Sequence, residues 1–283
     1  MKVVAPGKLV LTGAYAVLEG APAIVAAVDR RAVADTADPA DVDTRALSDG
    51  RGNKLGLGSS SASLVASLGA RAVLRGDDLR DGAVRAGLFR AARDAHARAQ
   101  GGGSGADVAA AVHGGVLRYS VNVRDGREAL VRGVRLPAGL VWAAFWSGAS
   151  ARTSDLVARV HSRRAREPNV LSELHRLAVV AASCVDSDDA RGFVSAAREY
   201  GRALDALGRA ADAPIVPPAF AELAASAADE DAAFLPSGAG GGDVAVWLST
   251  VSPSPAFAAR AEALSMRPLQ LHLDSDGVRI QAP

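Results

Sequence analysis

The stretch KLGLGSSSASL (residues 54–64) places two glycines and three consecutive serines directly before an apolar segment. A glycine- and serine-rich stretch is either a flexible linker or a loop that folds its backbone around a phosphate. The segment that follows, SASLVASLGARAVLRG (61–76), has apolar residues at helical spacing. Free N–H groups and the positive end of the dipole make a helix N-terminus suited to an anion. Taken alone, the stretch fits both a phosphate loop and an ordinary serine-capped helix.

Composition limits the class of protein. The chain has 283 residues, 49% of them hydrophobic, so we expect one large domain or two modest ones. Its net charge of +1 gives no global field that favours nucleic acid or a membrane surface. A single cysteine, Cys184, excludes an internal disulfide and favours a reducing compartment. Pro6 and Gly7 interrupt the N-terminus, and no stretch approaches the roughly 20 apolar residues of a membrane span, so we expect a soluble, cytoplasmic protein.

Helical and strand patterns mix along the chain without strict alternation, which predicts an α+β fold. Residues 21–36 fit a strand, with a helix as the rival, and residues 116–136 fit a hairpin. The expected strands also include segments at 8–12, 38–53, 140–148, 232–249 and a final strand at 269–280. The expected helices are at 61–76, 80–100, 106–115, 150–164, 169–185, 189–208, 218–231 and 255–265. A domain boundary is expected near Pro137.

Three glycine-rich stretches are candidates for binding phosphate: GLGSSSA (56–62), GGGSGAD (101–107) and PSGAGGGD (236–243). The first two precede or open helices. No G-x-x-x-x-G-K-[ST] motif occurs, and Ser61 takes the place of the third glycine of G-x-G-x-x-G. Neither a P-loop nor a dinucleotide-binding fingerprint therefore explains these stretches.

The order of the motifs resembles one known family. APGKLVLTGAYAVLEG (5–20), GLGSSSA and PSGAGGGD resemble, in this order, the three motifs of the GHMP kinases, and GSGADVAAAVHGG (103–115) resembles the segment that carries their catalytic aspartate. The run at 95–115 is most similar to the phosphomevalonate kinase branch. The resemblance implies an N-terminal domain like ribosomal protein S5 domain 2 (residues 1–137) and a C-terminal ferredoxin-like domain (138–283). ATP, Mg²⁺ and a small-molecule acceptor would bind at their junction.

The same resemblance assigns roles to individual residues. Lys8 and Asp107 would be catalytic, and Ser60 would contact Mg²⁺. For an alcohol acceptor Asp107 could take a proton, whereas a phosphate acceptor is already ionised and Asp107 could instead orient Lys8. An acid that stabilises the first turn of a helix is the alternative for Asp107. The ATP phosphates would be held by Gly56, Leu57, Gly58, Ser59, Ser60 and Ser61; the acceptor would be held by Lys8, Tyr15, His96, Ser104, Arg152, Thr153, Gly238, Ala239, Gly240 and Gly241.

Several positions depart from the family pattern. Ala14 replaces a frequent glutamate of motif 1, and His96 stands where many mevalonate kinases have a metal-binding glutamate. Leu235 replaces a lysine before PSG, and the segment between motifs 1 and 2 is short. These departures bring the adenine contacts and the nucleotide preference into question.

The leading functional hypothesis is therefore ATP-dependent phosphorylation of 5-phosphomevalonate to 5-diphosphomevalonate. Mevalonate kinase or another small-molecule kinase is the rival within the family, and a non-catalytic sensor of the same fold is a second class. A serine hydrolase rests only on His113 and abundant serines, without a G-x-S-x-G motif. No nucleic acid or membrane partner is expected, and a homodimer is left open.

Overall fold

The computed structural model describes residues 1–100, 102–122, 128–149, 153–163 and 168–282, and it has two sheets with helices packed on them. The first sheet has the order β10-β1-β2-β4-β5, with β3 paired to β2, and these neighbouring strands pair antiparallel. Its strands are β1 (Lys2–Thr12), β2 (Ala23–Asp35), β3 (Asp38–Asp43), β4 (Val116–Asn122), β5 (Glu128–Val134) and β10 (Arg279–Ile280).

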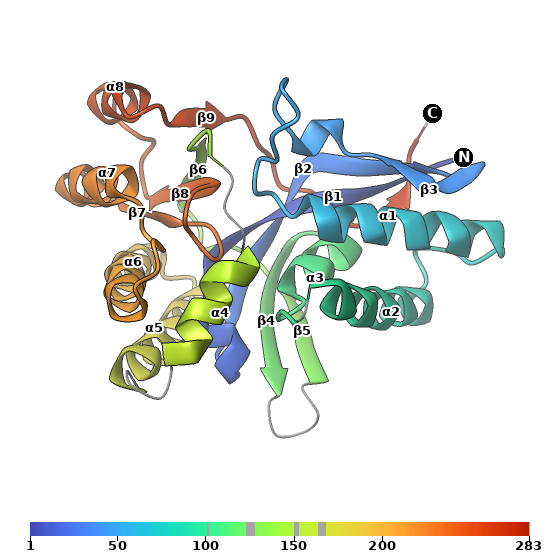
Figure 1. Ribbon diagram of the computed structural model, residues 1–283, viewed down its shortest axis with the longest axis horizontal. Coiled ribbons are helices and arrows are strands. Elements are labelled where there is room, and N and C mark those ends of the chain that lie inside the picture. The colour runs from blue at the N-terminus through green and yellow to red at the C-terminus, as the bar shows by residue number, and fades with distance from the viewer. Residues whose placement is uncertain (101, 123–127, 150–152, 164–167, 283) are drawn as a thin grey trace.

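Three helices, α1 (Ser59–Leu74), α2 (Gly82–Gln100) and α3 (Ala106–His113), pack beside the first sheet (Figure 1). The inner side of α1 is built from small residues, so the helix lies close to β1 and β2. A side chain at Gly69, for example, would come within 3.0 Å of Val3 and of Val278. Close packing places the N-termini of α1 and α3 against the β1 strand that carries Lys8.

The second sheet has the order β7-β8-β6-β9, from β6 (Val141–Trp146), β7 (Ala233–Pro236), β8 (Val244–Ser249) and β9 (Arg267–Leu269). All six residues of β8 are buried, and their alternation divides them between two clusters. Val244, Val246 and Leu248 join the main core, which continues into the first sheet, whereas Ala245 and Trp247 join a cluster beneath α7 and α8. A strand with both faces covered explains the uninterrupted apolar run VAVWL.

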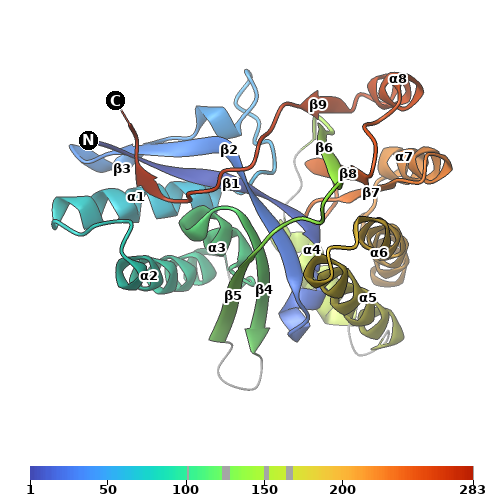
Figure 2. The same cartoon turned by 180° about the vertical axis from the view of Figure 1, so that it is seen from behind.

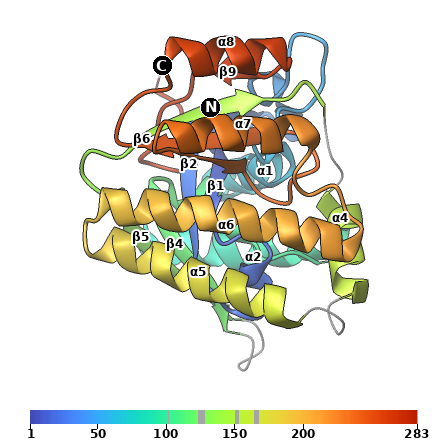
Figure 3. The same cartoon turned by 90° about the vertical axis from the view of Figure 1, so that its left-hand side faces the viewer.

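Most helices of the second half lie on the side of the molecule away from α1 and α2, and the first of them lies between the two groups (Figure 1, Figure 3). They are α4 (Thr153–Arg163), α5 (Pro168–Asp186), α6 (Ala190–Ala211), α7 (Pro218–Asp229) and α8 (Pro255–Ala263). Asp189 caps α6 by accepting a hydrogen bond from the Gly192 N–H, and Ser254 caps α8 in the same way from Phe257. Helix α5 packs on α6 and on the short 3₁₀ helix Ala16–Glu19, which joins the second half to the first.

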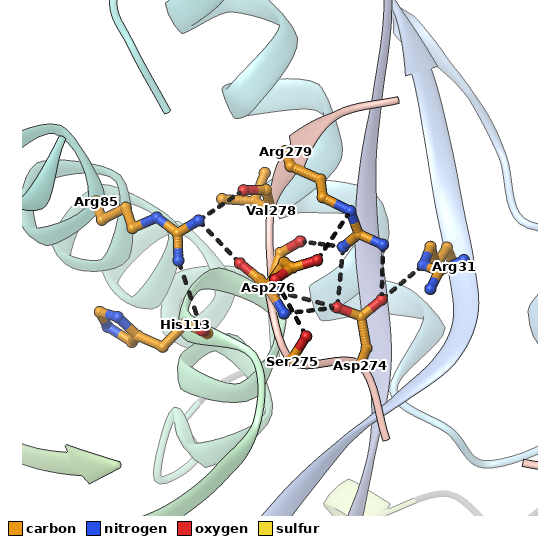
Figure 4. A network of polar contacts seen from close by, with 9 residues as sticks. Arg31, Arg85, His113, Asp274, Ser275, Asp276, Val278 and Arg279 are labelled. Atoms are coloured by element: carbon orange, nitrogen blue, oxygen red, sulfur yellow. Dashed lines mark hydrogen bonds and ion pairs between the residues drawn. The ribbon is translucent and has the colours of Figure 1, made fainter. Parts of the chain in front are cut away.

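The expected final strand at 269–280 is wrong. Only β9 and β10 are strands here, and the segment between them runs back across the molecule to pair with β1 (Figure 2). The break is caused by Asp274, whose Oδ1 accepts hydrogen bonds from the N–H groups of Asp276 and Gly277 and so bends the chain. The same carboxylate binds Arg31 (2.6 Å) and Arg279 (2.9 Å), so the turn is attached to the sheet (Figure 4).

Burial alone would raise the pKa of Asp274, but hydrogen bonds from Arg279 and Arg31 outweigh it and hold the pKa of that carboxyl below its usual value. Arg85 from α2 adds hydrogen bonds to the carbonyl groups of Asp276 and Val278 (Figure 4). The C-terminal segment is thereby joined to β2 and to α2.

The expected α+β class is confirmed, as is the strand reading of residues 21–36 against the helical one. Pro137 lies between β5 and β6, where the chain passes from the first sheet to the second. The domain boundary there remains a prediction, because the last residues of the chain rejoin the first sheet. Among the described helices, none is long and apolar enough to cross a membrane.

Candidate active site

A cleft of about 620 Å³ lies where β1, the N-terminus of α1, the N-terminus of α3 and the loop between β7 and β8 meet. Segments that are far apart in the sequence, near residues 8, 58, 105 and 238, form its wall. The residues that line it include Lys8, Tyr15, Lys54, Gly56, Gly58, Ser59, Ser60, His96, Ser104, Asp107, Gly238, Ala239 and Asp243.

The glycine-serine stretch forms one wall of this cleft. Helix α1 begins at Ser59, and its N-cap is Gly58, with φ of 77° and no side-chain cap. The alternative of an ordinary serine-capped helix is therefore wrong. The Ser61 hydroxyl instead donates to the Gly58 carbonyl at 2.8 Å, which is a bond back toward the loop. The first turn of an α-helix has N–H groups without intrahelical partners, so this wall is suited to a phosphate.

Strand β1 brings Lys8 to the glycine-serine loop. The Lys8 N–H donates to the Leu57 carbonyl at 2.8 Å, and its Nζ donates to the Gly56 carbonyl at 3.1 Å. Burial lowers the pKa of Lys8, while the charges of Asp107 and Asp243 act in the opposite direction and raise it. The result is a desolvated ammonium with two carboxylates near it at the cleft wall.

Asp107 is the second residue of α3, and its Oδ1 accepts the Val108 N–H at 2.9 Å. Its other oxygen, Oδ2, lies 3.7 Å from Nε2 of His96, a side chain that is 9% exposed. Within the described part of the chain, this Nε2 makes no hydrogen bond. His96, which was expected to bind the acceptor, therefore lies beside Asp107. The loop before α3 is held by the Tyr119 hydroxyl, which donates to the Ser104 carbonyl.

The glycine-rich loop between β7 and β8 closes the cleft. The Tyr15 hydroxyl donates to the Ala239 carbonyl at 2.6 Å, and the Val10 N–H donates to the Ser237 hydroxyl at 2.9 Å. Burial raises the pKa of the Tyr15 phenol, so it stays a donor. Gly240 lies against Ile215, whose carbonyl oxygen would be 2.0 Å from an added Cβ. The loop therefore contacts both β1 and the segment after α6.

Most of the expected site residues line one cleft, but some of them do not. The side chains of Leu57 and Ser61 are buried at 1% exposure, and Gly240 and Gly241 support the loop from behind. Arg152 and the Thr153 side chain lie outside the described residues. His113, the basis of the hydrolase alternative, is not among the residues lining the cleft and packs against Phe89 at a ring-centroid distance of 5.6 Å.

Sequence reasoning missed two charged residues of the cleft, Lys54 and Asp243. The sequence has a feature that could have identified each of them. Lys54 is one of only three lysines in an arginine-rich chain, and Asp243 ends the glycine run of PSGAGGGD. An acidic residue is unexpected in a loop that is a candidate for binding phosphate, and the charge of Asp243 acts on Lys8 across the cleft.

Comparison with known proteins agrees with this geometry. Residues 31–115 match the family described as GHMP kinases N terminal domain. The phosphomevalonate kinase of Streptomyces sp. (strain CL190) is 28% identical, with 86% of this chain and 88% of that protein covered.

Solved structures have the same fold at low identity. The Streptococcus pneumoniae phosphomevalonate kinase in complex with phosphomevalonate and AMPPNP has a TM-score of 0.81 at 18% identity, covering 96% of this chain and 99% of that one. The L. major mevalonate kinase in complex with R-mevalonate has a TM-score of 0.69 at 15% identity, covering 97% of this chain and 95% of that one. These findings show that residues 31–115 resemble the N-terminal domain of the GHMP kinases and that the chain has the fold of GHMP kinase structures.

Proposed function

We propose that this protein transfers the γ-phosphoryl group of ATP to 5-phosphomevalonate, giving 5-diphosphomevalonate and ADP. The observation that carries the proposal is the convergence of Lys8, the first turn of α1 and Asp107 on one cleft. The 28% identity to a phosphomevalonate kinase supports this acceptor over others.

In this reaction an oxygen of the acceptor phosphate forms a bond to the γ-phosphorus of ATP, and the bond from that phosphorus to the β–γ bridging oxygen breaks. Such a transfer depends mostly on positioning and on stabilising charge. The N–H groups at the start of α1 would bind the nucleotide phosphates, and Lys8 would neutralise charge on the transferred group. The Tyr15 hydroxyl holds the glycine-rich loop that faces them.

ATP and Mg²⁺ fit the residues present. Among the described residues no group of three His, Cys, Asp or Glu side chains is placed to hold a metal ion. This agrees with magnesium, which keeps waters and binds through substrate phosphates and one or two protein oxygens. Ser60 at the start of α1 is the proposed protein contact. When bound, the ion would neutralise the β- and γ-phosphate oxygens.

Asp107 has different roles for the two candidate acceptors. A phosphate monoester has its second pKa near 6, so at neutral pH it needs no base, and Asp107 would hold Lys8 in place. With mevalonate the acceptor is an alcohol, and Asp107 would take its proton. Mevalonate remains the second candidate acceptor because the mevalonate kinase fold is shared.

The test is ADP release with ATP and Mg²⁺, comparing 5-phosphomevalonate, mevalonate and no acceptor. We expect turnover with 5-phosphomevalonate alone. Turnover with mevalonate alone would assign the enzyme the alcohol acceptor. No turnover with either, in folded protein that binds nucleotide, would support another acceptor or the sensor class. Asp107→Asn should lose turnover while it still binds nucleotide. A cytoplasmic location stays an expectation from sequence, to be checked by fractionation, and a homodimer stays an open alternative, to be checked by light scattering.

A further inference from the structure

Asp243 has a left-handed backbone conformation, which aspartate adopts less easily than glycine. Its φ is +57°, and the glycines just before it, Gly240, Gly241 and Gly242, also have positive φ. Glycine adopts this region without a steric penalty, whereas other residues do so at a cost. Residues held in such conformations cluster at functional sites, where the surroundings keep them in place. A carboxylate at a position suited to glycine therefore needs a reason.

The packing of Asp243 gives the first part of that reason. A Cβ added at Gly56 would be 2.3 Å from the Cβ of Asp243 and 3.1 Å from its Oδ1, so the aspartate side chain lies directly against the phosphate loop. Its backbone is fixed on both sides, with its N–H donating to the Ala149 carbonyl at 2.7 Å and its carbonyl accepting the Ser147 N–H at 2.9 Å. The side chain also lines the cleft.

The charge of Asp243 gives the second part. The Lys8 Nζ donates to the carbonyl of Gly56, and Gly56 is the residue against which the Asp243 side chain packs. The charged and titratable groups that line the cleft with Lys8 are Asp243 from the β7–β8 loop, Asp107 from α3, His96 from α2, Tyr15 after β1, and Lys54 from the glycine-serine loop. Asp107 and Asp243 are the two that stabilise the ammonium form of Lys8. A lysine that is desolvated needs such partners to remain charged.

We propose that Asp243 is a positioning residue of this site: it packs against Gly56 of the glycine-serine loop and so holds the Gly56 carbonyl, and the Lys8 side chain that donates to it, at the cleft wall. The name of the reaction rests on the proposed function, but the placement of Lys8 does not. Asp243 acts through Lys8 and Gly56, and its removal should change Lys8 even when no substrate is present.

The test measures the titration of Lys8 directly. The chain has three lysines, Lys2, Lys8 and Lys54, so protein labelled with ¹³C at lysine Cε gives three signals, and Lys8→Met assigns one of them. In Asp243→Asn we expect proton binding by Lys8 to weaken roughly tenfold. Asparagine keeps the shape of aspartate and tolerates positive φ, so the fold is expected to persist.

Asp231→Asn is the matched control. Asp231 has a similar φ of +53°, and its side chain is fully exposed. The Lys8 titration should be the same in this variant as in the wild type. An unchanged Lys8 in Asp243→Asn, or an equal shift in both variants, would overturn the proposal.

Kinetics then separate this inference from the proposed function. Asp243→Gly suits the backbone, so its thermal midpoint should be at least that of the wild type, and its turnover should fall. In Asp243→Asn the alkaline limb of the kcat profile should move to lower pH, because Lys8 loses its proton earlier. If the wild type turns over no acceptor, the proposed function fails, while the Lys8 titration still decides the role of Asp243. Full turnover in Asp243→Gly would refute that role.

Discussion

We expect Gly56→Ala to lower the free energy of unfolding by more than the cost of placing an alanine at positive φ. Gly56 has φ of +78°, and the added methyl group would lie 2.3 Å from the Cβ and 2.7 Å from the Cγ of Asp243. Real Cβ atoms do not approach that closely, so either the phosphate loop or Asp243 must move. Asp243 is held by backbone hydrogen bonds to Ser147 and Ala149, which leaves the loop as the part that shifts.

Gly52 offers a matched control for the magnitude. Its φ is +84°, close to that of Gly56, but an added Cβ would meet nothing within 4 Å. Gly52→Ala therefore measures the cost of a left-handed alanine alone, about 1–2 kcal/mol. Gly56→Ala adds an overpacking cost of about 1–3 kcal/mol, so we expect a total loss of roughly 2–5 kcal/mol in the free energy of unfolding.

Urea unfolding of the wild type and both variants measures this difference, with the slopes compared to check that the unfolded states are alike. Titration with Mg·ADP then tests the loop itself. Affinity should fall sharply in Gly56→Ala and remain at the wild-type level in Gly52→Ala, which lies outside the cleft lining. Equal stability and equal nucleotide affinity in the two variants would refute the argument that Asp243 packs against the loop.

Three further substitutions test other parts of the site and fold. Lys8→Met should lower kcat roughly 100-fold or more in the ADP-release assay, because a charge that stabilises the transferred phosphoryl group is lost. Tyr15→Phe should lower the free energy of urea unfolding by about 0.5–1.5 kcal/mol. Since burial raises the pKa of the Tyr15 phenol, that loss should be the same at pH 7 and pH 9. Asp274→Asn should destabilise by about 2–3 kcal/mol at pH 7, because charged hydrogen bonds to Arg31 and Arg279 are lost. The folded-state pKa of Asp274 is depressed, so its stabilisation is present above the unfolded value near 4 and is lost as the pH falls through the folded value; wild type and variant should converge at low pH in urea unfolding.

The elements of this fold with a clear hydrophobic period were predictable from sequence. The helix after the glycine-serine stretch was expected from its apolar spacing and is α1, and the apolar run at 21–36 is the long strand β2. The final segment at 269–280 was not predictable in this way. Its alternating apolar residues predict one strand, but the Asp274 side chain bends the backbone and binds two arginines. One of these, Arg31, is 243 residues away along the sequence, so the pattern of residues 269–280 could not predict this contact.

In the site, too, the sequence motifs predicted which residues take part, but not the contacts between segments that are distant in sequence. The resemblance to the GHMP kinase motifs implied a shared site for Lys8, Ser60 and Asp107, and the three residues line one cleft. It did not predict that Lys8 donates to the Gly56 carbonyl or that His96 lies beside Asp107, because these contacts join different elements. Motif order gives the list of residues, and tertiary packing decides which of them affect one another.

The charges that line the cleft also bear on Ala14, which stands where motif 1 of the family it resembles often has a glutamate. Among the described residues that line the cleft, two carboxylates, Asp107 and Asp243, stand against two ammonium groups, Lys8 and Lys54. A glutamate at position 14 would add a third carboxylate to a site that must accept phosphate groups. Ala14 is instead small and buried, and its carbonyl accepts the Tyr200 hydroxyl at 2.6 Å, so the turn is fixed without a charge. Under the proposed function, Asp243 already supplies negative charge near Lys8, so the absence of an acid at position 14 is a weak argument for a sensor without turnover.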